Sequence, residues 1–303
     1  MWRAYVNDGA DPNNNALGYN YDWGYDQNGN PVLNGITMNR YLDDEATVRS
    51  GDTDWFNEIT RTGVIQQYNL SVSHGSDKSN SFFSVGYYKN VGTIKDSKFN
   101  RLSARANNDF KLYDGKVVIG ENFTINRTIG NDAPGGIIEN ALQFNPNFPI
   151  YAENGEYAQT LGIYFERENP LSVLERNKDN EYTQWRAFGD VHLSITPFKN
   201  FMIRTTFGMD YAQKQQRFLQ YPILNGKLKN LDTSAENKQE HTMRWMWNAI
   251  ATYNLEIGKH RGDAMVGVEL TRQNYNWTSA KRLEGWDVNT FSGVEILVDD
   301  IRY

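Results

Sequence analysis

Histidine and carboxylate side chains are the groups in this sequence that could perform acid–base chemistry or bind a metal. The four histidines, His74, His192, His241 and His260, lack metal-ligand spacing, and no His-Glu-x-x-His motif occurs. The sequence contains no Gly-x-Ser-x-Gly motif and no Walker loop. It also contains no cysteine, which excludes thiolate zinc sites and cysteine nucleophiles. We therefore expect no catalytic residue, no cofactor and no metal site, and the protein is predicted not to be an enzyme.

Two groups of oxygen-bearing side chains resemble functional patterns without completing them. Asp26, Asn28 and Asn30 have the spacing that opens a calcium loop, but Pro31 replaces the turn glycine and Thr37 replaces the bidentate glutamate. A solvated turn is the better interpretation of that segment. Other carboxylates could pair for glycoside hydrolysis only if they lie about 5–10 Å apart in space. These are Asp43, Asp44, Glu45, Glu166 and Glu168.

The composition combines a polar chain with many aromatic residues. Mean hydropathy is −0.69, whereas aromatic residues make up 14 % of the 303 residues. Disordered chains are poor in aromatics, so disorder fits badly. Apolar runs stop far short of the roughly 18 residues that a membrane-spanning helix needs. A net charge of −6 without a basic cluster argues against binding to nucleic acid.

Eight segments alternate apolar and polar residues with a period of two, which predicts β-strands. They cover residues 67–73, 81–89, 101–112, 117–125, 186–195, 201–211, 242–255 and 264–271. Most of them are close to the about 9–11 residues with which a tilted strand crosses a bilayer. Short connections (74–78, 113–115, 196–200 and 256–262) alternate with longer ones (90–98, 128–181, 213–239 and the tail after 272). In antiparallel order, all short turns then lie at one end, as in outer-membrane barrels.

A soluble β-sandwich would also produce alternation, but it does not explain strand length together with the asymmetry of the connections. We therefore predict an all-β fold, an antiparallel transmembrane β-barrel with long extracellular loops. Charged residues on one face of successive strands suit a water-filled lumen. The lumen-facing candidates are Arg101, Arg105, Asp109, Arg204, Asp210 and Arg244.

The sequence between the barrel strands and before them contains further signals. Residues 52–59 predict a short capped helix before the first strand, and residues 137–143 predict a helix in the longest loop. Asn28-Gly29 is a turn signal, although no long alternating segment precedes Val64. Four aromatic residues of the longest loop could stack on a sugar or a peptide side chain, or simply bury the loop. They are Tyr151, Tyr157, Tyr164 and Phe165.

The run Thr-Asp-Trp-Phe-Asn-Glu-Ile-Thr-Arg-Thr-Gly at residues 53–63 leads into Gln-Tyr-Asn-Leu-Ser-Val-Ser-His-Gly-Ser-Asp-Lys-Ser-Asn at residues 67–80. This stretch resembles the entry into the first barrel hairpin of SusC/RagA-like TonB-dependent outer-membrane transporters. Residues 2–12, 21–23, 169–171 and 245–253 support the resemblance, which extends over essentially the whole chain.

The resemblance implies that these eight strands are the first part of a larger barrel of about 22 strands. It implies that residues 1–63 are a pre-barrel segment after a missing plug, and that residues 64–303 belong to the barrel. It further implies a SusD-like surface lipoprotein as partner, contact with TonB through the missing N-terminal part, and surrounding outer-membrane lipid. The cargo would be oligosaccharide or peptide fragments, and the location the outer membrane of a Gram-negative bacterium. The four loop aromatics would then contact cargo or the lipoprotein lid.

Two other interpretations remain at this stage. Eight strands can close into a complete small outer-membrane barrel with an adhesive or structural role. Alternatively, the chain could be a soluble all-β carbohydrate-binding domain.

Overall fold

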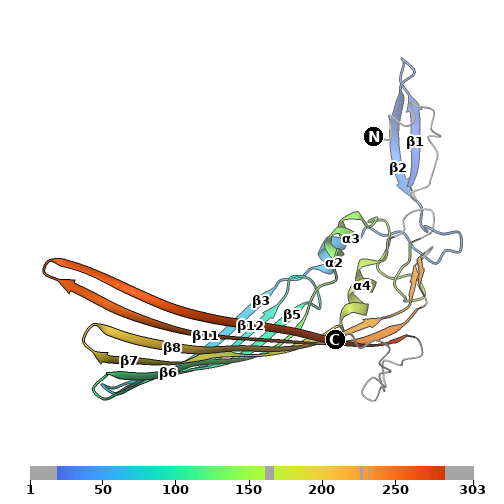
Figure 1. Cartoon of the computed structure of the whole chain (residues 1–303). Helices are drawn as coiled ribbons and strands as arrows, with labels where there is room; N and C mark the ends of the chain where they lie inside the picture. Colours follow the sequence, from blue (N-terminus) through green and yellow to red (C-terminus); the bar gives the residue numbers. More distant parts are fainter. Residues whose placement is uncertain (1–18, 161–166, 226–227, 231, 284–303) are drawn as a thin grey trace.

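An eight-stranded antiparallel sheet dominates the computed structural model, which describes residues 19–160, 167–225, 228–230 and 232–283 (Figure 1). Strands next to each other in the chain pair with each other, except that a small hairpin is inserted between β8 and β11. The predicted all-β fold with eight long strands is confirmed. The strands are β3 (Val64–Gly75), β4 (Ser79–Val91), β5 (Lys98–Leu112), β6 (Val117–Asn131), β7 (Tyr182–Phe198), β8 (Phe201–Gln220), β11 (Ser234–Ile257) and β12 (His260–Leu283).

The strands are longer than their alternating segments, and they extend mainly toward the end with the long connections. β3 has 12 residues, whereas β11 and β12 have 24 each. The expected loop 213–239 is wrong in its bounds, because β8 continues to Gln220 and β11 begins at Ser234. Similarly, β12 continues beyond residue 272. Backbone hydrogen bonds between strands do not require alternating side chains. Where a strand extends beyond the membrane and has water on both faces, it keeps these hydrogen bonds but no longer alternates apolar and polar residues.

The register aligns the apolar residues of all eight strands on one face. Leu70 lies opposite Val85, which lies opposite Ala104, and Ala104 lies opposite Ile125. Along β5 this apolar band extends from Leu102 to Leu112, close to the about 9–11 residues that cross a bilayer. Large apolar side chains of the band are exposed, as expected for a surface that contacts lipid. Examples are Tyr68, Leu70, Val72, Phe83, Val85, Phe110, Phe123, Val191, Phe207, Val266 and Val268.

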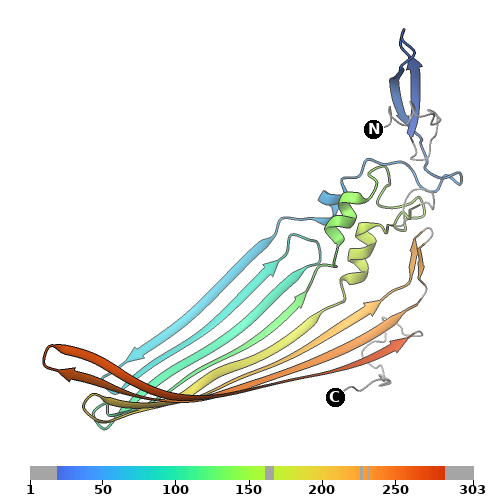
Figure 2. The same ribbon diagram turned by 45° about the horizontal axis from the view of Figure 1, so that its top comes forward.

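The two ends of the sheet differ, as the connection lengths predict. Tight turns join β3 to β4, β5 to β6, β7 to β8, and β11 to β12 at one end, and the helices lie at the other (Figure 2). β3 and β12 form the edges of the sheet, and in the described part of the chain no register pairs them with each other. The complete eight-stranded barrel considered above requires that pairing, so this arrangement counts against it.

Two short hairpins lie outside the main sheet. β1 (Tyr19–Tyr25) pairs with β2 (Pro31–Met38), and β9 (Ile223–Asn225) pairs with β10 (Leu228–Asn230). In the turn after β1, the Asp26 Oδ1 atom accepts hydrogen bonds from the backbone N–H groups of Asn28 and Asn30, both at 2.8 Å. The residues with calcium-loop spacing thus stabilise a turn, and Gly29 takes the required positive φ of 79°.

Three helices form a cap at the end of the sheet opposite the tight turns (Figure 2). They are α2 (Trp55–Ile59), α3 (Ile137–Gln143) and α4 (Pro170–Asn177). The predicted helix at 137–143 is confirmed, and the helix expected within 52–59 begins after its N-cap Asp54. We define the helical cap as residues 39–60 together with 132–160 and 167–180. Its core consists of Leu42, Val48, Trp55, Ile59, Ile137, Ala141, Phe144, Phe148, Ala158 and Leu174.

Candidate functional site

All six predicted lumen-facing residues lie on the polar face of the sheet. Arg101, Arg105 and Asp109 alternate with the apolar residues of β5, and Asp210 lies opposite Arg244 on neighbouring strands. Arg204 belongs to the same face of β8. The Arg186 guanidinium donates two hydrogen bonds to the Asp210 carboxylate, at 2.9 and 2.6 Å. Such bidentate contacts fix side-chain geometry, so Arg186 and Asp210 are held in one arrangement on this face.

A histidine with two carboxylate neighbours lies on the same face. His192 Nε2 is 3.1 Å from Asp109 Oδ1, and its Nδ1 is 3.5 Å from Asp190 Oδ2. The ring reaches Asp109 across β6 because Gly120 lies between them, and a Cβ atom there would collide with both side chains. Sequence reasoning treated His192 as isolated. The pairing row Asp109–Gly120–His192 across three strands is the signal that identifies the cluster.

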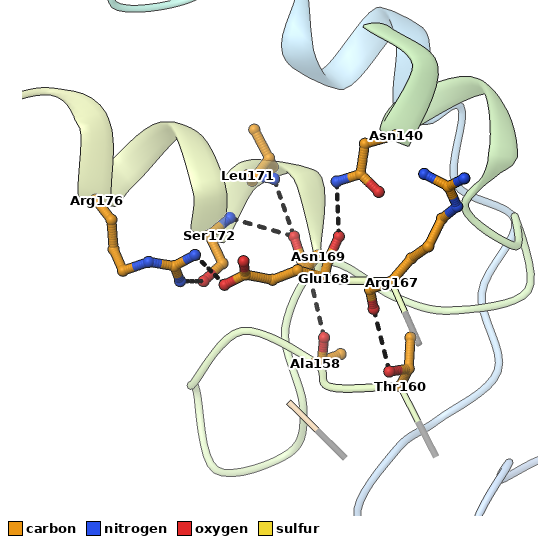
Figure 3. Close-up of polar contacts among 9 residues, drawn as sticks. All are labelled: Asn140, Ala158, Thr160, Arg167, Glu168, Asn169, Leu171, Ser172 and Arg176. Carbon is orange, nitrogen blue, oxygen red and sulfur yellow. Dashed lines mark hydrogen bonds and ion pairs between the residues drawn. The ribbon is translucent and has the colours of Figure 1, made fainter. Parts of the chain in front are cut away.

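A cavity of about 220 Å³ lies in the helical cap beside α4. Asn169 organises its wall, since its Nδ2 donates to the carbonyl oxygen of Ile150 at 3.0 Å. It also donates to that of Ala158 at 3.2 Å (Figure 3). Its Oδ1 accepts from the Leu171 N–H at 3.0 Å and thereby caps α4. The cavity is lined by Glu156, Tyr157, Ala158, Gln159, Glu168, Asn169, Ser172, Arg176 and Pro222.

An ion pair between Glu168 and Arg176 forms the charged part of this cavity. The side chains are only 16 % and 22 % exposed, respectively. Arg176 Nη1 also donates to Ser172 Oγ at 2.7 Å, as Figure 3 shows. Burial raises the pKa of the Glu168 carboxyl above its usual value, although Arg176 opposes the shift. The pair therefore exposes a fixed donor group and a carboxylate to any molecule that enters.

We expect Arg176→Met to destabilise the helical cap by about 2 kcal/mol at neutral pH. This is less than the about 3–5 kcal/mol for a fully buried pair, because water reaches both groups. Without its partner, Glu168 has a pKa that is higher in the folded cap than in the unfolded chain. The stability of the cap therefore falls as the pH rises from the unfolded pKa of Glu168 through its folded pKa, and it is regained on acidification. Protease sensitivity of residues 132–180 across a pH series measures this. Glu168→Gln combined with Arg176→Met is the control and should remove the pH dependence; a pH profile shared by both variants would contradict the argument.

Two of the four predicted loop aromatics form a pair beside this cavity. The rings of Tyr151 and Tyr157 stack with centroids 5.1 Å apart and planes 27° apart, and their backbones form an isolated antiparallel bridge. Burial and the neighbouring Tyr151 raise the pKa of Tyr157 to about 12. Tyr151 is 54 % exposed, so one edge of the pair faces solvent. Tyr164, Phe165 and the carboxylate candidate Glu166 lie outside the described residues.

Among the described residues, no three histidine or carboxylate side chains converge as metal ligands would. No helix in the described ranges has the length and apolarity needed to cross a membrane.

A meandering antiparallel sheet with an apolar band on one face, charges on the other and loops gathered at one end has the architecture of a transmembrane β-barrel wall. Comparison with known proteins specifies the kind of barrel. Over 73 % of its length the chain is 26 % identical to the TonB-dependent receptor P26 of Formosa agariphila, covering 22 % of that protein. Over 81 % of its length it is 23 % identical to the TonB-dependent receptor SusC of Bacteroides thetaiotaomicron, covering 26 % of it. No family model matches the chain.

Solved structures show the same architecture. The RagAB peptide importer superimposes in its closed-closed state with a TM-score of 0.66 and 17 % identity, covering 85 % of this chain and 29 % of that one. Its open-open state gives a TM-score of 0.67 with the same coverage. The resemblance to SusC/RagA-like TonB-dependent transporters is confirmed, and with it a location in the outer membrane of a Gram-negative bacterium. The chain spans about a quarter of the length of the curated relatives it matches, and these relatives are receptors rather than enzymes.

Proposed function

We propose that this chain is part of an active importer of the outer membrane, which takes up oligosaccharide or peptide fragments with energy from TonB. Within the barrel segment predicted for residues 64–303, the eight long strands between Val64 and Leu283 belong to its barrel wall, and residues 1–63 connect this wall to a plug. The observation that carries the proposal is the similarity to SusC and to the RagAB peptide importer over most of the chain, in a sheet with the architecture of a barrel wall. The importer makes and breaks no bond.

The partner proposed for the extracellular end is a SusD-like lipoprotein that covers the barrel. The helical cap lies at the end of the sheet away from the tight turns, which is the extracellular end in this orientation. Cargo bound under the lipoprotein would meet the cap first and the polar face of the wall next. Movement of the plug would then open a path along charged residues such as Arg101, Arg186 and Asp210.

Uptake measurements in cells that make the complete transporter test this function. Fluorescent oligosaccharides and oligopeptides too large for porins would be supplied to cells with and without the transporter, and with and without TonB. We expect one class of cargo to enter only when both proteins are present. Uptake that is unaffected by removal of TonB would contradict the proposal, and the class that enters identifies the cargo.

We expect Tyr151→Ala combined with Tyr157→Ala to weaken cargo uptake about 2- to 10-fold. Aromatic stacking contributes roughly 0.5–1.5 kcal/mol, and in this pair Tyr157 lines the cap cavity while Tyr151 faces solvent. The half-saturating cargo concentration for uptake is the measurement. Tyr113→Ala is the matched control, because Tyr113 is 77 % exposed in a tight turn at the opposite end of the sheet. Equal uptake in both variants would mean that the pair only stabilises the loop.

A further inference from the structure

Two basic residues lie on the apolar face at the end of the apolar band that is nearer the helical cap, Arg127 in its last row and Lys89 one row beyond. Lys89 on β4 lies opposite Asn100, and Arg127 on β6 lies opposite Leu102, so the two basic residues flank β5 one row apart on the same face. Neither forms an ion pair with a carboxylate in the described part of the chain. A third basic residue of this corner, Lys98, is paired with Glu181 at 2.6 Å. Two cations are therefore available there to an anion.

Trp185 marks the water–lipid boundary at the same place. The Arg127 guanidinium carbon lies 5.5 Å from the centroid of the Trp185 ring, in a cation–π contact. Tryptophan is enriched at membrane interfaces, where its ring sits at the level of the headgroups. This enrichment indicates that Arg127, in contact with Trp185, and the nearby Lys89 lie at the level expected for lipid phosphates.

An apolar groove of about 440 Å³ begins in the row next to Arg127, two rows from Lys89. It exists because β5 carries alanine at two successive positions of this face, between larger residues on β4 and β6. Leu102, the next residue of β5 on this face, lies in the row of Arg127, so Arg127 borders the groove and Lys89 lies one row beyond Arg127. The side chains that shape the groove are Phe83, Val85, Ala104, Ala106, Phe123 and Ile125.

We propose that this surface binds a phosphorylated glycolipid of the outer leaflet, with one acyl chain in the groove and a phosphate between Lys89 and Arg127. The choice of leaflet rests on the orientation in the proposed function, which puts the helical cap outside the cell. Lipid tails are as apolar as the groove, so the groove contributes packing rather than a hydrophobic driving force. The preference for a phosphate comes from charge-assisted hydrogen bonds, for which the planar Arg127 guanidinium is suited.

Lipid retention by the complete transporter tests this site. The protein is purified from outer membranes in mild detergent, and bound lipid A is counted by native mass spectrometry before and after addition of purified lipid A. We expect Lys89→Gln with Arg127→Gln to reduce the retained fraction at least about 5-fold, because both cations contact the phosphate. Ala104→Phe should reduce retention similarly by filling the groove.

The matched control is Ala249→Phe, since Ala249 lies on the apolar face of β11, opposite Thr205 and Val268 and away from the cationic corner. It should retain lipid A like the unchanged protein. Heat-modifiable gel mobility confirms that each variant is folded. Undiminished retention in the two test variants, or equal retention of phosphatidylethanolamine, overturns the proposal. TonB-dependent uptake, measured in the same cells, fails independently if the proposed transport function is wrong, so the two failures can be told apart.

Discussion

Replacing Trp55 by alanine is expected to destabilise the helical cap by about 3–5 kcal/mol, the usual cost of truncating a large buried aromatic residue. Trp55 is 2 % exposed and packs edge-on against Phe144, with ring centroids 4.8 Å apart. Its indole N–H donates to the carbonyl oxygen of Asn145 at 3.1 Å. The substitution removes the aromatic contact that joins α2 to the long connection after β6, and it leaves a cavity in the cap.

Limited proteolysis of intact cells measures this effect, because a detached connection at 132–180 becomes accessible to added protease. Phe56→Ala is the control, because Phe56 follows Trp55 on the same helix but its side chain is 46 % exposed. We expect cleavage in the Trp55 variant and protection in the Phe56 variant, with normal barrel mobility on gels in both. Equal protection of the two variants would show that the cap does not depend on this contact.

Replacing Gly189 by valine is expected to cost about 3 kcal/mol and to disturb the pairing of β6 with β7. A Cβ atom at Gly189 would collide with the backbone carbonyl oxygen of Asn122 and would lie 2.9 Å from the Cα atom of Phe123. Both atoms belong to the backbone, so a strand has to move to make room. Overpacking of this kind typically costs about 1–3 kcal/mol. The branched side chain of valine puts this substitution at the upper end of that range.

The yield of folded, heat-modifiable protein in outer membranes measures the effect. Gly208→Ala on β8 is the control, because the nearest atom to its added Cβ would lie 3.6 Å away, an ordinary contact distance. We expect a strongly reduced yield for Gly189→Val and a normal yield for Gly208→Ala. A normal yield for both would mean that β6 and β7 can separate at this point without loss.

The main sheet could be predicted from the sequence because lipid contact forces alternation. Rows such as Leu70–Val85–Ala104–Ile125 are apolar for that reason alone, and they identify the strands and their facing. Where the strands extend beyond the lipid, their ends were predicted too short. Residues 212–220 and 272–283 continue as strands without an apolar face, held by backbone pairing and by polar contacts such as that of Tyr275 with Glu240 at 2.6 Å.

The candidate sites were less predictable, because they depend on residues brought together from distant segments. The pair Tyr151–Tyr157 was anticipated by residue type, whereas the Glu168–Arg176 pair depends on α4, which sequence reasoning did not identify. His192 becomes part of a cluster only once the register places it two strands from Asp109. Without the strand register, the sequence does not show which residues are neighbours on adjacent strands.

The core of the helical cap joins two segments that are far apart in the chain. One segment ends at Ile59 and the other begins at Ile137, and all of β3 to β6 lies between them. Closing so long a loop is entropically costly until the intervening strands have paired and brought its ends together. We therefore expect the cap to form late, after the hairpins β3–β4 and β5–β6 have paired, and then to link the ends of these four strands through α2 and α3. In this order of assembly, contact between α2 and α3 reports that β3 to β6 have folded.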